Sequence, residues 1–509
     1  MRVLHVASEA APFAKTGGLA EARERRRQAA VVGSLPAALS RLGCSTSVVL
    51  PAYREVFASR RAPLEPTGWE FDVAVGSRRE RATIWQSRIA AGHGAEDVPV
   101  WLVGNDRYFD RPTLYGGADD YGDNAERFIF FCRAVFELAS RFEHPYDVIH
   151  SHDWQAGLVP AYQKVLASTW PRLARARTVH TIHNMAYQGV FWHWDMLLTG
   201  IDWRWFNWRQ MEYFGQLNLL KTGIVFADAV TTVSPTYARE IRSAPGGCSL
   251  EGTLADRGDA LLGIVNGIDT DRWNPGADPL LPRPYSADDA AEGKAAAKRA
   301  LAERFGGDPD DERPLLAFVG RLAEQKGVGL LLDLLARLAP GGRARFVILG
   351  TGDPHAEEAL RRMAASHPGT VDLVLGFDEG LAHLVQAGAD MLLVPSLYEP
   401  CGLTQLYALR YGTIPIVRAT GGLVDTVVDA TPEALASGRA SGFVFEHADG
   451  NGLAWAVERA LDLHAERGRW GEMVRRVMAQ DWSWDKSARD YLALYRRLLD
   501  SPPVPVHVP

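Results

Sequence analysis

The segment that decides the fold spans residues 395–405 and reads PSLYEPCGLTQ. The apolar run 391–395 before it is typical of a buried strand, and a helix is expected to begin at residues 402–404. Between them, Glu399 is held in a turn that Pro400 makes rigid. The first N–H groups of a helix carry its positive dipole end and suit an anion, while Glu399 suits sugar hydroxyls. This order of strand, polar turn and helix predicts one unit of a parallel α/β sheet with a ligand site at its edge.

The same alternation of short apolar runs and helical stretches extends over most of the chain. Further strands are expected at residues 3–7, 46–50, 98–103, 147–150, 178–182 and 229–233, and at 315–319, 345–349, 371–375 and 414–418. Between the two series, residues 269–313 are rich in Pro, Asp and Ala and contain one helical stretch at 290–305. The chain is therefore predicted to fold as two α/β halves around a linker, with ligands held in a cleft between them.

These features predict the domain boundaries. A first domain is expected over residues 1–265, and a second over residues 266–480 that includes the linker 269–313. Residues 481–500 place apolar side chains at helical spacing and predict a closing helix, and residues 501–509 are expected to form a flexible tail.

Composition excludes several classes of protein. The chain has 509 residues, of which 47% are hydrophobic and 23% charged, as in ordinary globular proteins. The net charge of −7 has the wrong sign for a protein that binds nucleic acid over its surface. The four cysteines are too few and too scattered for a disulfide framework, and no uncharged apolar run is long enough to cross a membrane. We therefore expect a cytoplasmic protein with no nucleic-acid or membrane partner.

The first half offers polar groups directly after its predicted strands. Lys15 precedes Gly17 and Gly18 in a turn whose N–H groups suit an oxyanion, although a plain structural turn is the alternative. Asp153 and His183 follow two later strands, which places both at one sheet edge and favours a functional role for His183.

The second half offers cations at a strand end. Arg321 and Lys326 follow the strand 315–319 and fit a diphosphate, with solvated surface cations as the alternative. The loop that begins at Gly350 suits a ribose or a base, and Cys401 is interpreted as a packing residue rather than a nucleophile.

Two residue types are enriched without a clear motif. The histidines lack the tight spacing of metal ligands, so no metal site is expected; they are His5, His150, His152, His180 and His183. Five of the 15 tryptophans lie between residues 192 and 208. They are expected mainly to pack in the core, with stacking on sugar rings as the alternative.

Five motifs occur in the order of one known family. They are KTGGL at 15–19, HNMAYQG at 183–189, NGID at 266–269, GRL at 320–322 with KG at 326–327, and EPCGLTQ at 399–405. With these motifs, the chain resembles the bacterial glycogen synthase and plant starch synthase family from residue 1 to about residue 500. The resemblance implies a GT-B fold, in which two Rossmann-like domains face each other across a cleft and a C-terminal helix crosses back to the first domain.

The resemblance also implies roles for individual residues. The implied catalytic residues are His183 near the anomeric carbon, Glu399 on the glucose hydroxyls, and Arg321 and Lys326 on the diphosphate. The implied donor-binding residues are Lys15, Gly17, Gly18, Asn266, Arg321, Lys326, Gly350, Phe377, Glu399, Gly402, Leu403 and Thr404, and Phe377 is the one that stacks on adenine. The implied acceptor-side residues are Asp153, Asn184, Tyr187 and Gln188.

The implied reaction transfers glucose with retention from ADP-glucose to the non-reducing end of an α-1,4-glucan and releases ADP. The partners are thus ADP-glucose and glycogen, and neither a metal nor pyridoxal phosphate is expected, because cationic side chains stabilise the leaving diphosphate. Two alternatives stay open: a related GT-B transferase with a different acceptor, and a glucan-binding protein whose activity is impaired by the insert described next.

Residues 21–30 depart from the family pattern. Ten residues, EARERRRQAA, stand here where the family has one. Nine extra residues would add about two and a half helical turns, which is the wrong phase for a simple extension of the first helix. We therefore expect either that the insert loops out or that it forms a protruding helix while Val31 restarts the packed one.

Overall fold

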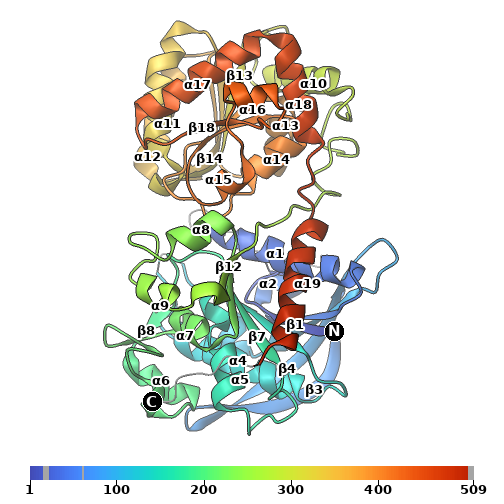
Figure 1. Cartoon of the computed structure of the whole chain (residues 1–509), viewed down its shortest axis with the longest axis vertical. Helices are drawn as coiled ribbons and strands as arrows, with labels where there is room; N and C mark the ends of the chain where they lie inside the picture. Colours follow the sequence, from blue (N-terminus) through green and yellow to red (C-terminus); the bar gives the residue numbers. More distant parts are fainter. Residues whose placement is uncertain (15–21, 60–61, 118, 503–509) are drawn as a thin grey trace. The chain divides into compact units, whose positions relative to one another are not determined.

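The computed structural model describes residues 1–14, 22–59, 62–117 and 119–502 (Figure 1). The chain divides into two compact units. One unit comprises Met1–Ile264 together with the C-terminal residues from Trp484, and the other comprises Val265–Ser483. The division thus falls after Ile264, and the closing helix belongs to the first unit.

The first unit is built on a nine-stranded sheet in the order β12-β11-β7-β6-β1-β2-β5-β4-β3. Its strands are β1 (Arg2–Val6), β2 (Ser45–Pro51), β3 (Glu65–Val75), β4 (Arg78–Ile89), β5 (Val98–Gly104), β6 (Val148–His152), β7 (Arg177–Ile182), β11 (Ala229–Thr232) and β12 (Leu261–Gly263). Six neighbouring strands of this sheet, β5, β2, β1, β6, β7 and β11, pair in parallel. These six are the strands predicted from the sequence. Their order is that of a Rossmann sheet, with the chain reversing its direction of winding between β1 and β6.

Other elements surround this sheet. The antiparallel β3 and β4 extend it at one edge, and a small separate sheet contains β8 (Val190–Phe191), β9 (Glu212–Tyr213) and β10 (Gln216–Asn218). The helices are α1 (Ala22–Arg41), α2 (Arg54–Ser59), α3 (Asp106–Phe109), α4 (Asn124–Ala139), α5 (Leu158–Val165), α6 (Met196–Thr199), α7 (Leu219–Phe226), α8 (Pro235–Glu240), α9 (Glu251–Ala255) and α19 (Trp484–Asp500).

Helix α1 corrects both expectations for the insert. It runs from Ala22 to Arg41 without interruption, so residues 22–30 do not form a loop and Val31 does not restart a separate helix. Val31, Leu35 and Leu39 recur at helical spacing and are fully buried in a core cluster that includes side chains of α19. Packing of this apolar stripe fixes the rotation of the helix about its own axis. The insert residues 22–30 then form the N-terminal part of the same helix.

Helix α19 completes the first unit. Its apolar face buries Tyr491, Leu494 and Tyr495 in the same cluster as α1. Arg41 of α1 donates to Asp485 at the start of α19 with an Nε–Oδ1 distance of 2.9 Å. The predicted closing helix is therefore confirmed, and these contacts bring chain segments more than 400 residues apart into one core.

The second unit contains a six-stranded parallel sheet in the order β15-β14-β13-β16-β17-β18. Its strands are β13 (Leu315–Leu322), β14 (Arg345–Gly352), β15 (Val371–Leu375), β16 (Met391–Val394), β17 (Ile414–Arg418) and β18 (Phe443–Phe445). The helices are α10 (Ala290–Arg304), α11 (Val328–Leu338), α12 (Pro354–Ser366), α13 (Glu379–Gly388), α14 (Thr404–Arg410), α15 (Gly422–Thr426), α16 (Pro432–Ala436), α17 (Gly450–Ala465) and α18 (Arg467–Met478). This is again the Rossmann order, with the reversal between β13 and β16.

The predicted linker is a packed part of the second unit. Trp273 lies between His383 and Tyr407, with ring centroids 3.9 and 3.8 Å away and nearly parallel planes. Helix α10 confirms the predicted helical stretch. Among the helices that the structure describes, none has the length and apolar character needed to span a bilayer, and the cytoplasmic location stays a prediction.

Candidate functional site

The predicted donor residues of the second unit gather where the sheet order reverses. Lys326 lies in the turn after β13, and Glu399 lies in the turn after the neighbouring strand β16. Although 73 residues separate them in the chain, Lys326 Nζ lies 2.5 Å from Glu399 Oε2. Loops that follow adjacent strands at such a reversal diverge and leave room for a ligand, so these two side chains stand at the usual ligand position of the fold.

The Lys326–Glu399 pair is shielded from solvent. The two side chains are only 13% and 2% exposed. The Ser396 hydroxyl also donates to Glu399 Oε2, at 3.0 Å. An ammonium holds three N–H donors and a carboxylate two acceptor oxygens, which are groups that bind phosphate and sugar hydroxyls respectively.

Gly327 explains how Lys326 reaches Glu399. Its φ of +69° is one that side-chain-bearing residues rarely adopt, and a Cβ there would lie 1.9 Å from the carbonyl oxygen of Pro395. Only glycine lets the turn after β13 approach the end of β16 this closely. The neighbouring Arg321 is the penultimate residue of β13 and donates from Nη2 to Gln325 Oε1 at 2.6 Å, so a second cation lies at this sheet edge.

The turn after Glu399 leads into helix α14. Gly402 has a φ of +71°, and Gln405 Nε2 donates to the carbonyl oxygens of Cys401 and Gly402 at 3.0 Å each. The helix begins at Thr404 after Leu403, and no side chain of the described residues caps it, so its first N–H groups suit an anion. Cys401 is fully buried, in line with its interpretation as a packing residue.

Three more predicted donor residues differ in their surroundings. Asn266 is 1% exposed, and within the described residues neither its amide nitrogen nor its amide oxygen has a hydrogen-bond partner. A buried amide without partners is costly unless a ligand or water satisfies it. Phe377 is 51% exposed just after β15, and Gly350 lies in β14 where a Cβ would meet the Gly320 carbonyl oxygen at 2.1 Å.

In the first unit, the structure brings Asp153 and His183 together after β6 and β7. Asp153 Oδ1 accepts a hydrogen bond from the His183 backbone N–H at 2.8 Å, and its own N–H donates to Thr181 at 2.9 Å. Asp153 has a φ of 55° and a ψ of −176°, a strained conformation for a residue with a side chain. Such strain is concentrated at functional sites.

The remaining acceptor-side predictions lie in the turn after His183. Asn184 is buried, and its Oδ1 accepts from Ala186 N–H at 3.0 Å, while Tyr187 is half-buried. Gln188 is held at both ends of its amide, by Asn218 at 2.7 Å and by the Cys248 carbonyl at 2.8 Å, which suits a residue that shapes the loop. Lys15, Gly17 and Gly18 lie outside the described residues.

Comparisons with known proteins identify the family. The family model for the starch synthase catalytic domain matches residues 2–256, and the model for glycosyl transferases group 1 matches residues 301–477. A glycogen synthase of an Anaeromyxobacter species is 46% identical over 98% of this chain and 99% of its own. The chain belongs to the glycogen and starch synthase family. A glycogen synthase of Rhodopirellula baltica is 42% identical over 98% of both chains.

Comparison with solved structures supports the same family. The catalytic domain of starch synthase IV from Arabidopsis thaliana, bound to ADP and acarbose, superposes with a TM-score of 0.86 at 34% identity, covering 98% of this chain and 99% of its own. The fold is therefore GT-B. Its two Rossmann-like domains are the two units described above, and α19 is the C-terminal helix that returns to the first domain. A sucrose-phosphate synthase from Thermosynechococcus elongatus shares this fold at a TM-score of 0.57 and 19% identity, covering 99% of this chain and 100% of its own.

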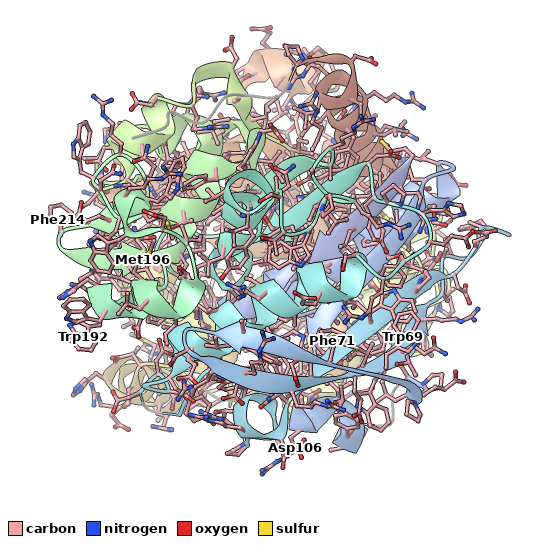
Figure 2. The ribbon with its side chains drawn as sticks, turned by 90° about the horizontal axis from the view of Figure 1, so that it is seen from below. Trp69, Phe71, Asp106, Trp192, Met196 and Phe214 are labelled. Atoms are coloured by element: carbon pink, nitrogen blue, oxygen red, sulfur yellow. The ribbon has the colours of Figure 1, made fainter. Side chains whose placement is uncertain are left out.

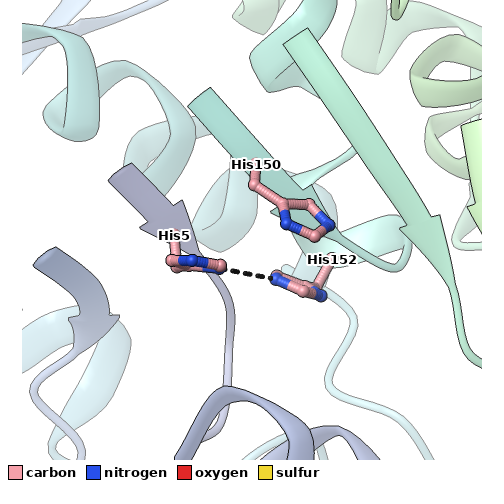
Figure 3. A group of neighbouring side chains, drawn as sticks. All are labelled: His5, His150 and His152. Carbon is pink, nitrogen blue, oxygen red and sulfur yellow. Dashed lines mark hydrogen bonds between the residues drawn. The ribbon is translucent and has the colours of Figure 1, made fainter. Parts of the chain in front are cut away.

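In this member of the glycogen and starch synthase family, the structure also shows a histidine cluster that the sequence analysis missed. Side-chain nitrogens of His5, His150 and His152 lie within 4.8 Å of one another (Figure 3). Spacing along the chain did not indicate this cluster, because β1 and β6 are neighbours in the sheet and pair His5 with His150; the expectation that no metal is bound stays a prediction. The available signal was that His5 and His150 both fall within predicted strands, and His152 follows the second of them by two residues.

The tryptophans between residues 192 and 208 also correct an expectation. Trp192, Trp194, Trp203 and Trp208 are exposed, and only Trp205 of the five is buried. They lie in short turns beside the small β8–β10–β9 sheet rather than in a core element, and Figure 2 shows Trp192 and Phe214 at the surface near Met196. Core packing therefore accounts for one of these side chains and not for the cluster.

Proposed function

We propose that this member of the family transfers glucose from ADP-glucose to the non-reducing end of an α-1,4-glucan with retention of configuration and releases ADP. The observation that carries the proposal is the buried Lys326–Glu399 pair, which lies beside Arg321 at the reversal of the second sheet. Full-length similarity to glycogen synthases supports the glucan product, and similarity to a starch synthase with bound ADP supports the nucleotide.

The donor would be held mainly by the second unit. Lys326 and Arg321 neutralise the diphosphate, helped by the uncapped start of α14 at residues 402–404. Glu399 accepts hydrogen bonds from the glucose hydroxyls, and Ser396 keeps that carboxylate oriented. Asn266 and the loop at Gly350 contact the nucleoside, and Phe377 offers an exposed ring face for adenine.

The chemistry would depend on stabilising the departing ADP. Charge develops on the diphosphate as the glycosidic bond to glucose breaks, and cations already fixed at that position lower the barrier. We therefore propose that neither a metal nor pyridoxal phosphate takes part. His183 and Asp153 would lie on the glucosyl side, while Asn184, Tyr187 and Gln188 shape the acceptor end; the family resemblance adds Lys15, Gly17 and Gly18 to the donor site.

The test measures transfer of radiolabelled glucose to glycogen. ADP-glucose and UDP-glucose are compared as donors, with and without EDTA. We expect transfer from ADP-glucose to exceed that from UDP-glucose, and EDTA to change the rate less than twofold. Absence of transfer from either donor would refute the proposed function, and a rate that EDTA abolishes and Mg²⁺ restores would refute the metal-independent mechanism.

A further inference from the structure

Three exposed tryptophans of the first unit form a continuous aromatic surface. Trp192, Trp194 and Trp203 are 63%, 48% and 41% exposed, and Trp192 stands at the surface in Figure 2. The ring centroids of Trp192 and Trp194 lie 6.4 Å apart, and those of Trp194 and Trp203 lie 5.5 Å apart. We call these three side chains the tryptophan platform. Met196 and Trp205, which lie close to them in sequence, are buried, so the core of this region is filled without the platform.

The platform stands on a rigid frame. It is presented by two single-turn 3₁₀ helices, η2 (His193–Asp195) and η3 (Trp203–Trp205), on either side of α6. The carbonyl oxygen of Thr199, at the end of α6, accepts hydrogen bonds from Arg133 Nη1 at 2.7 Å and from the Tyr162 hydroxyl at 3.1 Å. Because the frame is fixed before a ligand arrives, binding to the rings costs little conformational entropy.

A buried cation fixes the chain that follows η3. Lys221 is buried, and its Nζ donates to the carbonyl oxygens of Trp208 at 2.5 Å and of Glu212 at 2.6 Å. Burying an ammonium is costly unless hydrogen bonds compensate it, and here the compensating bonds hold this surface segment. The exposed rings are therefore a fixed feature of the fold and not the consequence of a loose loop.

The platform lies close to the predicted acceptor end. Trp192 follows Gln188 by four residues, so their Cα atoms are at most about 14 Å apart. The intervening strand β8 pairs with β10, and Asn218 of β10 donates to the Gln188 amide oxygen at 2.7 Å. A polymer whose end lies at the acceptor residues therefore has its next sugar units within reach of the platform.

Charge and ring geometry select the class of ligand. Residues 192–208 contain two carboxylates and one guanidinium, whereas a bilayer or a nucleic acid requires an excess of basic side chains. Indole faces suit the apolar faces of uncharged sugar rings. The ring planes of Trp192 and Trp194 are inclined by 75°, and those of Trp194 and Trp203 by 37°, so the platform is curved. An α-1,4-glucan bends at each linkage, whereas a β-1,4-glucan is extended and flat, so the curved platform favours the α-linked chain.

A second copy of the chain is a poorer occupant of the platform. With about 250 Å² for a whole indole side chain, the exposed parts of the three rings amount to about 400 Å². A stable protein interface buries about 800 Å² on each partner. The platform is therefore too small to hold a dimer by itself, while each of its rings covers about one sugar unit.

We propose that the tryptophan platform binds the α-1,4-glucan polymer beyond its acceptor end and holds it on the enzyme. This inference rests on the proposed function for the identity of the glucan. A polymer held at a second place re-enters the acceptor site before it diffuses away, so the platform lowers KM for long glucans. A short acceptor occupies the acceptor site alone and gains nothing from the platform.

The direct test is electrophoresis of the full chain in native gels that contain glycogen. The triple variant Trp192→Ala/Trp194→Ala/Trp203→Ala removes the platform, and Trp455→Ala is the matched control, since Trp455 is 55% exposed on α17 of the second unit. We expect glycogen to retard the parent and Trp455→Ala at least threefold more than the triple variant, and hydroxyethylcellulose to retard none of them. Equal retardation of the parent and the triple variant, or retardation of the parent by hydroxyethylcellulose, would overturn the proposal.

A urea denaturation midpoint shows first whether the triple variant folds. If it does not fold, Trp192→Ala replaces it, because the Trp192 side chain is the most exposed of the three. We expect this single variant to lose at least half of the retardation by glycogen, and retardation equal to that of the parent would overturn the proposal.

Kinetics separate the platform from the acceptor site itself. We expect the triple variant to raise KM for glycogen at least fivefold and to change KM for maltotriose and for ADP-glucose less than twofold. An equal rise in KM for maltotriose would place the rings in the acceptor site and overturn the proposal. An equal rise in KM for glycogen in Trp455→Ala would overturn it as well.

Failure of this proposal is distinguishable from failure of the proposed function. If the parent transfers glucose to neither glycogen nor maltotriose, the proposed function fails, while the glycogen gels still decide whether the platform binds glucan. Light scattering tests the other occupant. A dimer in the parent that becomes a monomer in the triple variant would show that a second copy covers the platform and would overturn the proposal.

Discussion

The buried Lys326–Glu399 pair makes Lys326→Met the sharpest perturbation of the proposed site. Methionine retains the apolar stem and removes the ammonium that lies 2.5 Å from Glu399 Oε2. Because the two side chains are 13% and 2% exposed, water cannot replace the lost cation, and breaking such a pair costs about 3–5 kcal/mol of folding free energy. Adding Glu399→Gln removes the uncompensated charge, so the double variant is expected to regain at least about 1.5 kcal/mol.

Activity should fall by more than stability explains. A charged contact to the departing diphosphate is worth about 2–4 kcal/mol in a closed site, which corresponds to a loss of about 30- to 900-fold in kcat/KM. The double variant should regain stability but not activity. The assays are urea denaturation and radiolabelled glucose transfer, with the rate expressed per folded protein.

Lys298→Met provides the matched control in the same unit. Lys298 Nζ lies 2.8 Å from Asp390 Oδ2, and the side chains are 18% and 15% exposed. Asp390 precedes β16, so this pair lies at the opposite end of the strands from Glu399. We expect a loss of stability with kcat/KM within threefold of the parent. The reasoning is refuted if Lys326→Met keeps the stability of the parent and a third of its kcat/KM, or if Lys298→Met loses as much activity.

Three further predictions test separate features. Gly327→Ala should lower kcat/KM at least tenfold, because the added Cβ would lie 1.9 Å from the Pro395 carbonyl oxygen. The control Gly329→Ala has open space around its Cβ and should retain at least half of the parent's kcat/KM. Equal activities of the two variants would contradict this prediction. Asp153→Asn should lower kcat/KM at least tenfold with an unchanged denaturation midpoint, and parent-like turnover would argue against its role. Burial lowers the pKa of Lys294 to about 7, so between pH 7 and about 10.5 the unfolded chain binds more protons than the folded chain, and the free energy of unfolding should rise with pH. In the Lys294→Met variant this free energy should rise less over the same range. Identical pH profiles of the two proteins would count against this assignment.

Much of the fold could be predicted from local patterns. Six of the seven parallel strands described in the first unit and five of the six in the second follow from short apolar runs, because each run must be buried on both faces of a parallel sheet. The hairpin of β3 and β4 was not foreseen, since the first half of β3 is largely exposed and lacks regular alternation. The predicted course of α1 through the insert was also wrong. The buried apolar side chains of Val31, Leu35 and Leu39 fix the rotation of the helix about its axis, and the insert extends the helix from there.

The sequence by itself determined the chemical inventory of the candidate site: cations after β13, a carboxylate after β16, and glycines where the backbone must turn sharply. Local chemistry is sufficient for this, because a glycine or a strand end acts on its own neighbours. Only the tertiary structure decided that Lys326 meets Glu399 across 73 residues, and that His5, His150 and His152 lie side by side. Strand order is set by packing of the whole sheet, so which distant side chains become neighbours is not written in their spacing along the chain.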